Sequence, residues 1–318
     1  MSPFSSEKPT LLLVGPLLPS LQQRLETDYT SLRLWEQSNR SAFLGEHAGT
    51  IDVIVTSGVH GADAELIGAL PNLKAIVSFG VGFDSIDIAA AKDRGVMVSN
   101  TPGVLDDCVA DTAFALLIDV ARGITAADRF VRRGDWLKGK YPLTCKLGGR
   151  TCGIVGLGNI GKAIATRVSA FGMQVAYYGR QQQVDVPYTY HADLHALARA
   201  SDFLVLAVPG GKATENLIDA AALEALGSQG YLVNIARGSV VDQDALITAL
   251  QNGTIAGAGL DVFADEPNVP QSLIEMDNVV LTPHLASGTH DTRQAMAQLV
   301  LDNLDRFVTQ GELVTPVY

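Results

Sequence analysis

The chain has 318 residues, of which 47% are hydrophobic, 18% charged and 6% aromatic. This composition is typical of a globular protein, and the length favours two domains of ordinary size. The formal net charge of −11, without a dense run of Lys or Arg, argues against nucleic acid as a partner, because affinity for polyphosphates comes from cations. A small anionic ligand is still compatible with this charge, since one or two Arg residues can bind it locally.

The cysteines and the start of the chain bear on its location. Cys108, Cys145 and Cys152 have neither the spacing of a zinc site nor the number of a disulfide framework. The polar residues 1–10 do not resemble a secretory signal, and no segment contains 18 consecutive apolar residues. These features favour the cytoplasm, with no membrane partner.

The first 99 residues alternate short apolar runs with longer stretches of helical period. The runs comprise residues 11–14, 51–56, 75–78 and 96–99. They are rich in β-branched residues and apolar on both faces, as expected of parallel strands covered by helices on each side. We therefore predict an α/β fold class, with a doubly wound sheet in this part of the chain.

A breaker cluster, Asn-Thr-Pro-Gly at 100–103, marks the predicted domain boundary. An apolar helical stretch follows from about Asp107 to Ala121 and continues, more polar, to Arg133. This helix is too apolar around its circumference to face solvent. It is either an interior or domain-spanning helix or part of a subunit interface.

A second α/β series begins at Thr151. Its strand-like runs comprise residues 152–155, 174–178, 203–208, 231–235, 257–261 and 279–282. Six strands suit one complete doubly wound sheet. The chain then turns helical at about residues 291–310, and this last segment is expected to pack back on the first domain.

The sequence GLGNIG at 156–161 lies between the first of these strands and an amphipathic stretch, which is the context of a dinucleotide fingerprint. Gly156 permits the tight turn, Gly158 lets the backbone approach a pyrophosphate, and Gly161 allows close packing of the helix. Asn159 and Ile160 lie at the helix N-terminus, which faces the anion. The alternative is a Gly-rich turn with a purely structural role.

The end of the second strand of this series normally carries an acid that binds the ribose hydroxyls of NAD. Here the sequence is Tyr-Gly-Arg-Gln at 178–181, so the acid is missing and Arg180 is available. A guanidinium attracts a 2′-phosphate, which favours NADP(H) and leaves NAD(H) as a possible second cofactor. The alternative is a solvated surface arginine.

Three blocks at the ends of later strands contain Arg237, Glu266 and His284. Reduction of a 2-oxo acid needs a cation to orient the carboxylate and polarise the ketone, and an acid to protonate its oxygen. Arg237 and His284 suit these two functions, and Glu266 would orient the imidazole and keep it protonated. Taken singly, Arg237 could instead bridge two loops, Glu266 could cap a turn and His284 could be a buried structural residue.

The chain resembles the D-isomer-specific 2-hydroxyacid dehydrogenase family along nearly its whole length. The stretches that carry the resemblance are 153–162 (GIVGLGNIGK), 231–246 (YLVNIARGSVVDQDAL), 257–267 (GAGLDVFADEP) and 282–288 (TPHLASG). The resemblance implies a Rossmann-like cofactor domain, residues 100–288, inserted into a flavodoxin-like substrate domain, residues 1–99 completed by 289–318. It also implies that Arg237 binds substrate and that Glu266 and His284 form the catalytic pair.

Within the family, residues 179–181 and 136–139 are most similar to NADPH-preferring glyoxylate and hydroxypyruvate reductases, including the hydroxyphenylpyruvate reductase type. This likeness implies a homodimer, in which Trp136 either reaches the partner's cleft or simply packs in the interface. It implies that amides of Val81 and Gly82 bind the substrate carboxylate, although their loop could be a plain strand-to-helix turn. The further cofactor-binding residues implied are Val208, Pro209, Thr214, Ile235, Ala236, Asp261, which would meet the nicotinamide amide, and Ala286.

The function predicted is hydride transfer from NADPH to a small 2-oxo acid, giving the D-2-hydroxy acid without a metal ion. Two alternatives remain open: a nucleotide-sensing binding protein of the same fold, and an NAD-dependent dehydrogenase of another D-2-hydroxy acid. Four histidines have no motif around them and are expected to be ordinary surface residues: His60, His191, His195 and His290.

Overall fold

The computed structural model describes residues 8–318. The described chain forms two compact units, the first made of residues 8–105 and Thr289–Tyr318 and the second of Asp106–Gly288. Across residues 8–318, every helix falls short of the length or the apolar content that a membrane span requires.

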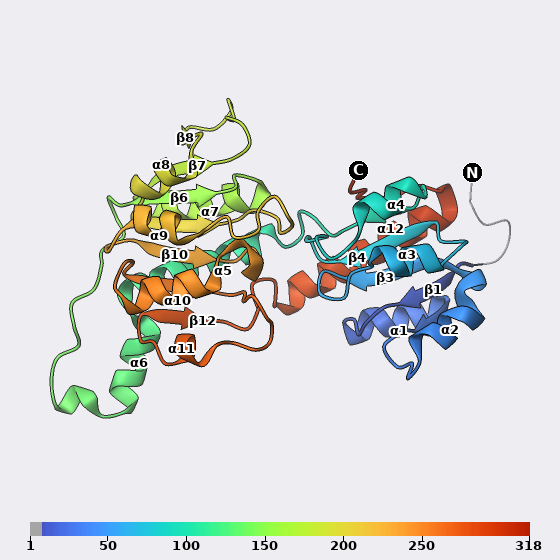
Figure 1. Ribbon diagram of the computed structural model, residues 1–318, viewed down its shortest axis with the longest axis horizontal. Coiled ribbons are helices and arrows are strands. Elements are labelled where there is room, and N and C mark those ends of the chain that lie inside the picture. The colour runs from blue at the N-terminus through green and yellow to red at the C-terminus, as the bar shows by residue number, and fades with distance from the viewer. Residues whose placement is uncertain (1–7) are drawn as a thin grey trace. The chain divides into compact units, whose positions relative to one another are not determined.

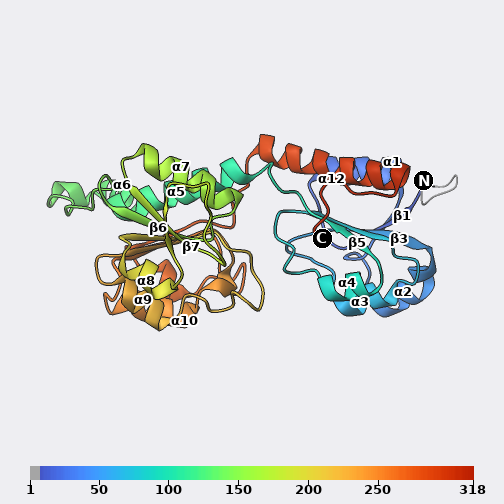
Figure 2. The same ribbon diagram turned by 90° about the horizontal axis from the view of Figure 1, so that it is seen from above.

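The first unit contains a five-stranded parallel sheet with the order β2-β1-β3-β4-β5, the strand order of the flavodoxin-like fold. Figure 2 shows α1 and α12 on one face of this sheet and α2, α3 and α4 on the other. The strands are β1 (Thr10–Leu13), β2 (Thr30–Arg33), β3 (Ile51–Ser57), β4 (Ala75–Phe79) and β5 (Met97–Ser99). The helices are α1 (Pro19–Asp28), α2 (Arg40–His47), η1 (Ala48–Thr50), α3 (Ala64–Ala69), α4 (Ile88–Asp93) and α12 (His290–Gln310).

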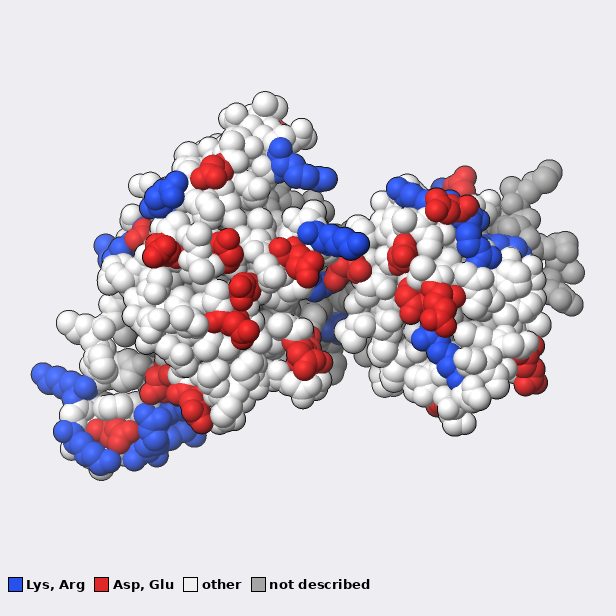
Figure 3. Space-filling model, viewed as in Figure 1, with Lys and Arg blue, Asp and Glu red and all other residues white. Residues whose placement is uncertain are grey.

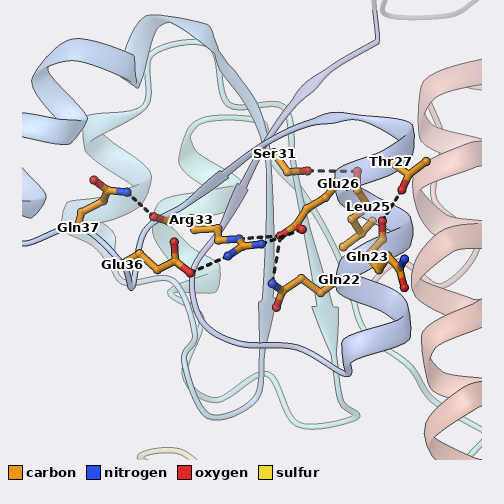
Figure 4. A network of polar contacts seen from close by, with 9 residues as sticks. All are labelled: Gln22, Gln23, Leu25, Glu26, Thr27, Ser31, Arg33, Glu36 and Gln37. Carbon is orange, nitrogen blue, oxygen red and sulfur yellow. Dashed lines mark hydrogen bonds and ion pairs between the residues drawn. The ribbon is translucent and has the colours of Figure 1, made fainter.

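The edge strand β2 was not predicted from the sequence. Its four residues, Thr-Ser-Leu-Arg, are half-buried or exposed, so they do not form the apolar run that marks the inner strands. Side-chain contacts bind this edge to α1, because the guanidinium of Arg33 donates to both carboxylate oxygens of Glu26, at 2.7 and 2.8 Å (Figure 4). Arg33 also donates to Glu36, which follows β2, at 2.7 Å. The edge of the sheet is thus held by charge pairing as well as by backbone hydrogen bonds.

The second unit contains a seven-stranded parallel sheet with the order β12-β11-β10-β9-β6-β7-β8. Counted from β6, this is the Rossmann order 3-2-1-4-5-6 with one further strand. The strands are β6 (Thr151–Val155), β7 (Gln174–Tyr178), β8 (Thr189–His191), β9 (Phe203–Leu206), β10 (Tyr231–Asn234), β11 (Gly257–Leu260) and β12 (Val279–Leu281). The helices are α5 (Asp106–Arg122), α6 (Ile124–Arg132), η2 (Asp135–Leu137), α7 (Asn159–Ala170), α8 (Leu194–Arg199), α9 (Ala220–Leu226), η3 (Gly238–Val240), α10 (Gln243–Gln251) and α11 (Gln271–Ile274).

Helices cover both faces of this second sheet. In Figure 2, α5 and α7 lie on one face and α8, α9 and α10 on the other. The two sheets confirm the predicted α/β fold class. The sequence missed β8, a three-residue edge strand without a buried residue, for the same reason as β2: an edge strand needs no apolar run on both faces.

The predicted helix that continues to Arg133 is divided in the structure. Gly123 adopts a left-handed conformation with φ +60°, so α5 ends at Arg122 and α6 begins at Ile124. Helix α6 and η2 form an arm, residues 124–146, that extends from the body of the second unit (Figure 1). Figure 3 shows Lys, Arg and acidic side chains gathered over this arm, including the ion pairs of Asp135 with Arg133 and Lys138.

Candidate active site

The glycine-rich turn lies at the carboxyl end of β6 and leads into α7. Gly156 has φ +96°, and a Cβ atom on it would lie 2.8 Å from the carbonyl oxygen of Ala207. A Cβ on Gly161 would lie 2.2 Å from the carbonyl oxygen of Gly156. Around Gly158, by contrast, a Cβ would meet no described atom within 4 Å. The fold therefore requires the first and third glycines, whereas the second leaves an open place beside the start of α7, where a pyrophosphate fits.

Arg180 lies two residues beyond the end of β7, the strand that pairs with β6. The loop that carries it is attached to the glycine-rich turn, because the side chain of Gln183 donates to the carbonyl oxygen of Leu157 at 2.8 Å. The amide N–H of Gln183 donates to the hydroxyl of the buried Tyr177 at 2.7 Å. Arg180 itself is exposed. These contacts fix the loop of Arg180 to the glycine-rich turn and leave Arg180 exposed.

The loop after β9 borders the turn from the other side. The Val208 side chain and the Ala207 carbonyl are the atoms that a Cβ on Gly156 would meet. The hydroxyl of Thr214 donates to the carbonyl oxygen of Pro209 at 2.7 Å and so closes this loop. Val208, Pro209 and Thr214 are thus brought to one loop beside the glycine-rich turn, as expected of neighbouring strands that end at the same edge of the sheet.

Arg237 follows β10 on a turn that the buried side chain of Asn234 shapes. The Asn234 amide donates to the carbonyl oxygen of Arg237 at 2.9 Å, and its oxygen accepts from the N–H of Ala236 at 3.0 Å. The guanidinium of Arg237 donates to the carbonyl oxygen of Ala236 at 2.7 Å. Ile235 and Ala236 are buried, whereas Arg237 is partly exposed.

Glu266 and His284 form a hydrogen-bonded pair. Nδ1 of His284 lies 2.7 Å from Oε2 of Glu266, and the other carboxylate oxygen of Glu266 accepts from the N–H of Phe263 at 3.0 Å. The peptide bond between Glu266 and Pro267 is cis, and His284 has φ +50°. With Nδ1 engaged, Nε2 is the imidazole nitrogen left for an external group. Both side chains are about a third exposed, so a ligand can reach them.

Asp261 holds the loop that carries His284. Its fully buried carboxylate accepts hydrogen bonds from the hydroxyl of Thr282 at 2.7 Å, the N–H of Leu285 at 2.8 Å and the N–H of Ala286 at 2.9 Å. Its carbonyl oxygen accepts from the N–H of His284 at 2.9 Å. Two strand ends, β11 and β12, are thereby fixed to each other. The contact of Asp261 with a nicotinamide amide stays a prediction.

Val81 and Gly82, which the sequence analysis predicted to bind substrate, lie in the first unit, in the loop after β4. The side chain of Asn100 donates to the carbonyl oxygen of Val81 at 2.7 Å, and Gly80 exchanges hydrogen bonds with Thr101. Within residues 8–318, the amides of Val81 and Gly82 donate no hydrogen bond. The binding of a substrate carboxylate by these two amides stays a prediction.

Trp136 lies in η2 on the arm of the second unit. Its side chain is 68% exposed and that of Leu137 is 94% exposed. Large apolar side chains so exposed are typical of a surface that another molecule covers.

Comparison with known proteins identifies the family. The profile described as D-isomer specific 2-hydroxyacid dehydrogenase, NAD binding domain, matches residues 114–286. The chain is 44% identical over 307 residues to glyoxylate/hydroxypyruvate reductase A of Arabidopsis thaliana, covering 96% of this chain and 98% of that protein. It is 46% identical over 312 residues to 2-ketogluconate reductase of Gluconobacter oxydans, covering 98% and 99%.

The chain belongs to the D-isomer-specific 2-hydroxyacid dehydrogenase family. Among solved structures it is similar to the NADPH-dependent glyoxylate/hydroxypyruvate reductase of Sinorhizobium meliloti, crystallised with NADP and malonate, with a TM-score of 0.92, 43% identity and coverage of 98% of this chain and 97% of that one. The resemblance drawn from the sequence is thereby confirmed, and the protein is a nicotinamide-dependent oxidoreductase. The roles of its individual residues stay predictions.

Three residues that shape the site of this dehydrogenase had no role assigned from the sequence. They are Asn234, Gln183 and Gly238, where a Cβ atom would lie 1.9 Å from the carbonyl oxygen of Phe263. A polar residue at the buried end of an apolar strand was the available signal for Asn234. The other two act through loop contacts, which leave no periodic pattern. Among the described residues, no cluster of three or more His, Cys, Asp or Glu side chains is arranged to hold a metal ion.

Proposed function

We propose that this dehydrogenase reduces small 2-oxo acids to D-2-hydroxy acids with NADPH as its preferred cofactor. The observation that carries the proposal is the hydrogen-bonded pair of His284 and Glu266, on the same sheet as a glycine-rich turn whose second glycine faces open space. An acid-base pair and a pyrophosphate-binding turn at one sheet edge are the requirements for nicotinamide-dependent reduction of a ketone.

The second unit binds the dinucleotide in this proposal. Gly156, Gly158, Asn159, Ile160 and Gly161 receive the pyrophosphate at the start of α7, where the helix dipole favours an anion. The residues that line the remaining dinucleotide are Val208, Pro209, Thr214, Ile235, Ala236, Asp261 and Ala286. When bound, NADPH supplies the hydride for the carbonyl carbon of the substrate.

Arg237, Glu266 and His284 carry the chemistry. The guanidinium of Arg237 pairs with the carboxylate of the 2-oxo acid and polarises its carbonyl group. The imidazolium of His284 donates the Nε2 proton to the carbonyl oxygen as the hydride reaches carbon, so the ketone gains one hydride and one proton and becomes the alcohol. Glu266 holds Nδ1 and offsets the positive charge of the imidazolium, and oxidation of the alcohol reverses each step.

In the first unit, residues 8–105 and 289–318, the amides of Val81 and Gly82 bind the substrate carboxylate. Their N–H groups make no other hydrogen bond within the described chain, so a carboxylate can take both without displacing a protein group. Binding an anion through backbone amides requires no buried cation.

NADPH is preferred over NADH because Arg180 occupies the position of the ribose-binding acid. A guanidinium that contacts the 2′-phosphate contributes about 1.5–3 kcal/mol, which corresponds to about a 10- to 150-fold difference in the dissociation constant. The test is Arg180→Ala: we expect weaker NADPH binding by that factor and unchanged NADH binding. Equal loss for both cofactors would contradict the assignment, and Arg199→Ala, another exposed arginine of the second unit, is the control.

A homodimer that works in the cytoplasm completes the proposal. The arm carries five large apolar side chains that are at least half exposed: Ile124, Val131, Trp136, Leu137 and Leu143. A second copy that covers this surface would bury them, and Trp136 would then contact the partner subunit. Cys108, Cys145 and Cys152 are not joined in disulfides, which is consistent with a reducing compartment.

The experiment that tests the proposed function is an assay of NADPH or NADH oxidation with glyoxylate, hydroxypyruvate, pyruvate, phenylpyruvate and hydroxyphenylpyruvate. We expect oxidation of NADPH with at least one of these acids, at a higher kcat/KM than with NADH. Binding of NADPH without oxidation in the presence of any acid would favour a nucleotide-sensing protein instead. Faster oxidation of NADH would favour an NAD-dependent dehydrogenase.

A further inference from the structure

We propose that His60 makes this enzyme select 2-oxo acids that carry a long hydroxylated tail, through a hydrogen bond between Nε2 and a hydroxyl group of that tail. The inference rests on the proposed function, because it takes the substrate carboxylate to be bound by the amides of Val81 and Gly82. It concerns the first unit alone and identifies the part of the substrate that this unit recognises.

His60 lies where a flavodoxin-like sheet binds its ligand. The strand order β2-β1-β3-β4-β5 reverses direction between β1 and β3, and ligands of such sheets bind beyond the carboxyl ends of the strands at this switch point. Gly15 follows β1, and Ser57 is the last residue of β3. The imidazole of His60 packs against the first and hydrogen-bonds to the second, so it lies at the switch point itself.

The ring of His60 is held from two sides. A Cβ atom on Gly15 would lie 2.3 Å from the imidazole, so only glycine lets the ring pack there. On the other side, Nδ1 lies 2.9 Å from the hydroxyl oxygen of Ser57. The side chain is nevertheless exposed. Fixing an exposed side chain costs rotamer entropy and gains little from burial of apolar surface. A side chain that is fixed although exposed is expected at a site where it binds a ligand.

The hydrogen bonds around Ser57 determine which imidazole nitrogen is available to a ligand. The backbone N–H of His60 points at the Ser57 oxygen at 3.4 Å, so this oxygen serves as the acceptor there. A hydroxyl oxygen has two lone pairs and one proton, so it can accept this N–H and still pair with Nδ1 as donor or as acceptor. Within residues 8–318, Nε2 makes no hydrogen bond. The nitrogen that faces a ligand is therefore Nε2, and a hydroxyl group matches it because a hydroxyl can donate as well as accept.

The distance from the carboxylate-binding loop sets the length of the tail. The His60 loop packs directly on the loop after β4, because the Ser85 hydroxyl donates to the carbonyl oxygen of Gly58 at 2.9 Å. The ring itself lies over the end of β1, two strands away from β4 in the sheet. Two strand spacings amount to about 10 Å. Glyoxylate has no tail to cross this span, whereas a six-carbon 2-oxo acid with several hydroxyl groups approaches it.

The test compares the steady-state kinetics of the wild type and His60→Ala, with NADPH, on two substrates, 2-ketogluconate and glyoxylate. Loss of one neutral hydrogen bond corresponds to about a 3- to 10-fold effect. We therefore expect the ratio of kcat/KM for 2-ketogluconate over glyoxylate to fall about 3- to 10-fold, through weaker binding of the longer substrate rather than a lower kcat. Gly15→Ala should lower the same ratio, because the added methyl group displaces the ring without changing its chemistry.

The control is His47→Ala, which removes a partly exposed histidine of the same unit. His47 is the last residue of α2, shortly before the amino end of β3, whereas His60 follows the carboxyl end of β3. The ratio of kcat/KM values should therefore stay at the wild-type value. An unchanged ratio in His60→Ala would overturn the inference, as would a wild type that reduces glyoxylate but not 2-ketogluconate. A wild type that reduces no 2-oxo acid would instead overturn the proposed function.

Discussion

Nδ1 of His284 and Oε2 of Glu266 are 2.7 Å apart, although the two residues are 18 positions apart in the chain. They follow different strands, β12 and β11, which are neighbours in the sheet. The same carboxylate accepts a hydrogen bond from the N–H of Phe263, so the backbone fixes the position of the Glu266 carboxylate that contacts the histidine. The carboxylate of Glu266 therefore has two effects, because it orients the imidazole and offsets its positive charge. A substitution that keeps the shape of the side chain tests the effect of the charge alone.

Glu266→Gln preserves the shape of the side chain and removes its charge. We expect kcat to fall about 100- to 10,000-fold, because the imidazolium loses its counter-charge and general acid catalysis contributes that range. The affinity for NADPH should stay unchanged. The measurement is a steady-state rate combined with a fluorescence titration of NADPH, and the exposed Glu224→Gln serves as the control. A kcat above half the wild-type value would remove Glu266 from the mechanism.

Asp261→Asn should destabilise the second unit as well as slow the enzyme. Three donors point at the two carboxylate oxygens, so an amide NH₂ group must face one of them in a fully buried position. An unsatisfied buried polar group costs about 1–3 kcal/mol of the free energy of unfolding. Urea denaturation measures this loss, and the exposed neighbour Asp265→Asn should leave the midpoint in place. A fully stable but inactive Asp261→Asn would indicate that the carboxylate acts on the cofactor alone.

Gly158→Ala and Gly161→Ala should affect different properties, the first the affinity for NADPH and the second the stability of the fold. The Cβ added at Gly158 meets open space, so the fold should keep its stability while the affinity for NADPH falls at least about 10-fold through the loss of close backbone approach. The Cβ added at Gly161 would lie 2.2 Å from a carbonyl oxygen, and overpacking of this kind costs about 1–3 kcal/mol. Thermal unfolding and NADPH titration of both variants distinguish the two cases. Tight NADPH binding by Gly158→Ala would show that the pyrophosphate does not approach this turn.

The pair of Arg33 and Glu26 should make the first unit sensitive to acid. Hydrogen bonds from Arg33 lower the pKa of the Glu26 carboxyl below its usual value. A carboxyl group with a lowered folded-state pKa stabilises the fold above its unfolded pKa of about 4.3, and this contribution is lost as the pH falls through the folded-state value.

Glu26→Gln should therefore be less stable than the wild type at pH 7, with the difference disappearing at the lower end of that window. The effect should be small because the pair is partly exposed. Thermal unfolding followed from pH 7 to pH 2 measures it, and Glu46→Gln, at a position that is 77% exposed, is the control. A difference that grows toward acid pH would contradict the sign of this prediction.

The sequence by itself determined those parts of this dehydrogenase that local patterns encode. The inner strands are apolar on both faces, the helices have their own period, and the glycine-rich turn must follow a strand and precede a helix. Arg237, Glu266 and His284 were predicted as site residues because each follows a predicted strand, and parallel strands bring their carboxyl ends to one edge of the sheet. The family followed from the same stretches of sequence.

Only the tertiary structure decided how those residues are held. The edge strands β2 and β8 escaped the sequence pattern because they have solvent on one side and need no continuous apolar run. The carboxylate of Asp261 accepts three hydrogen bonds, and their donors are residues 21 to 25 positions away along the chain. His60 likewise has no motif, yet Gly15, which packs on its ring, belongs to a neighbouring strand end. Such contacts depend on strand order, which leaves no periodic signal along the chain.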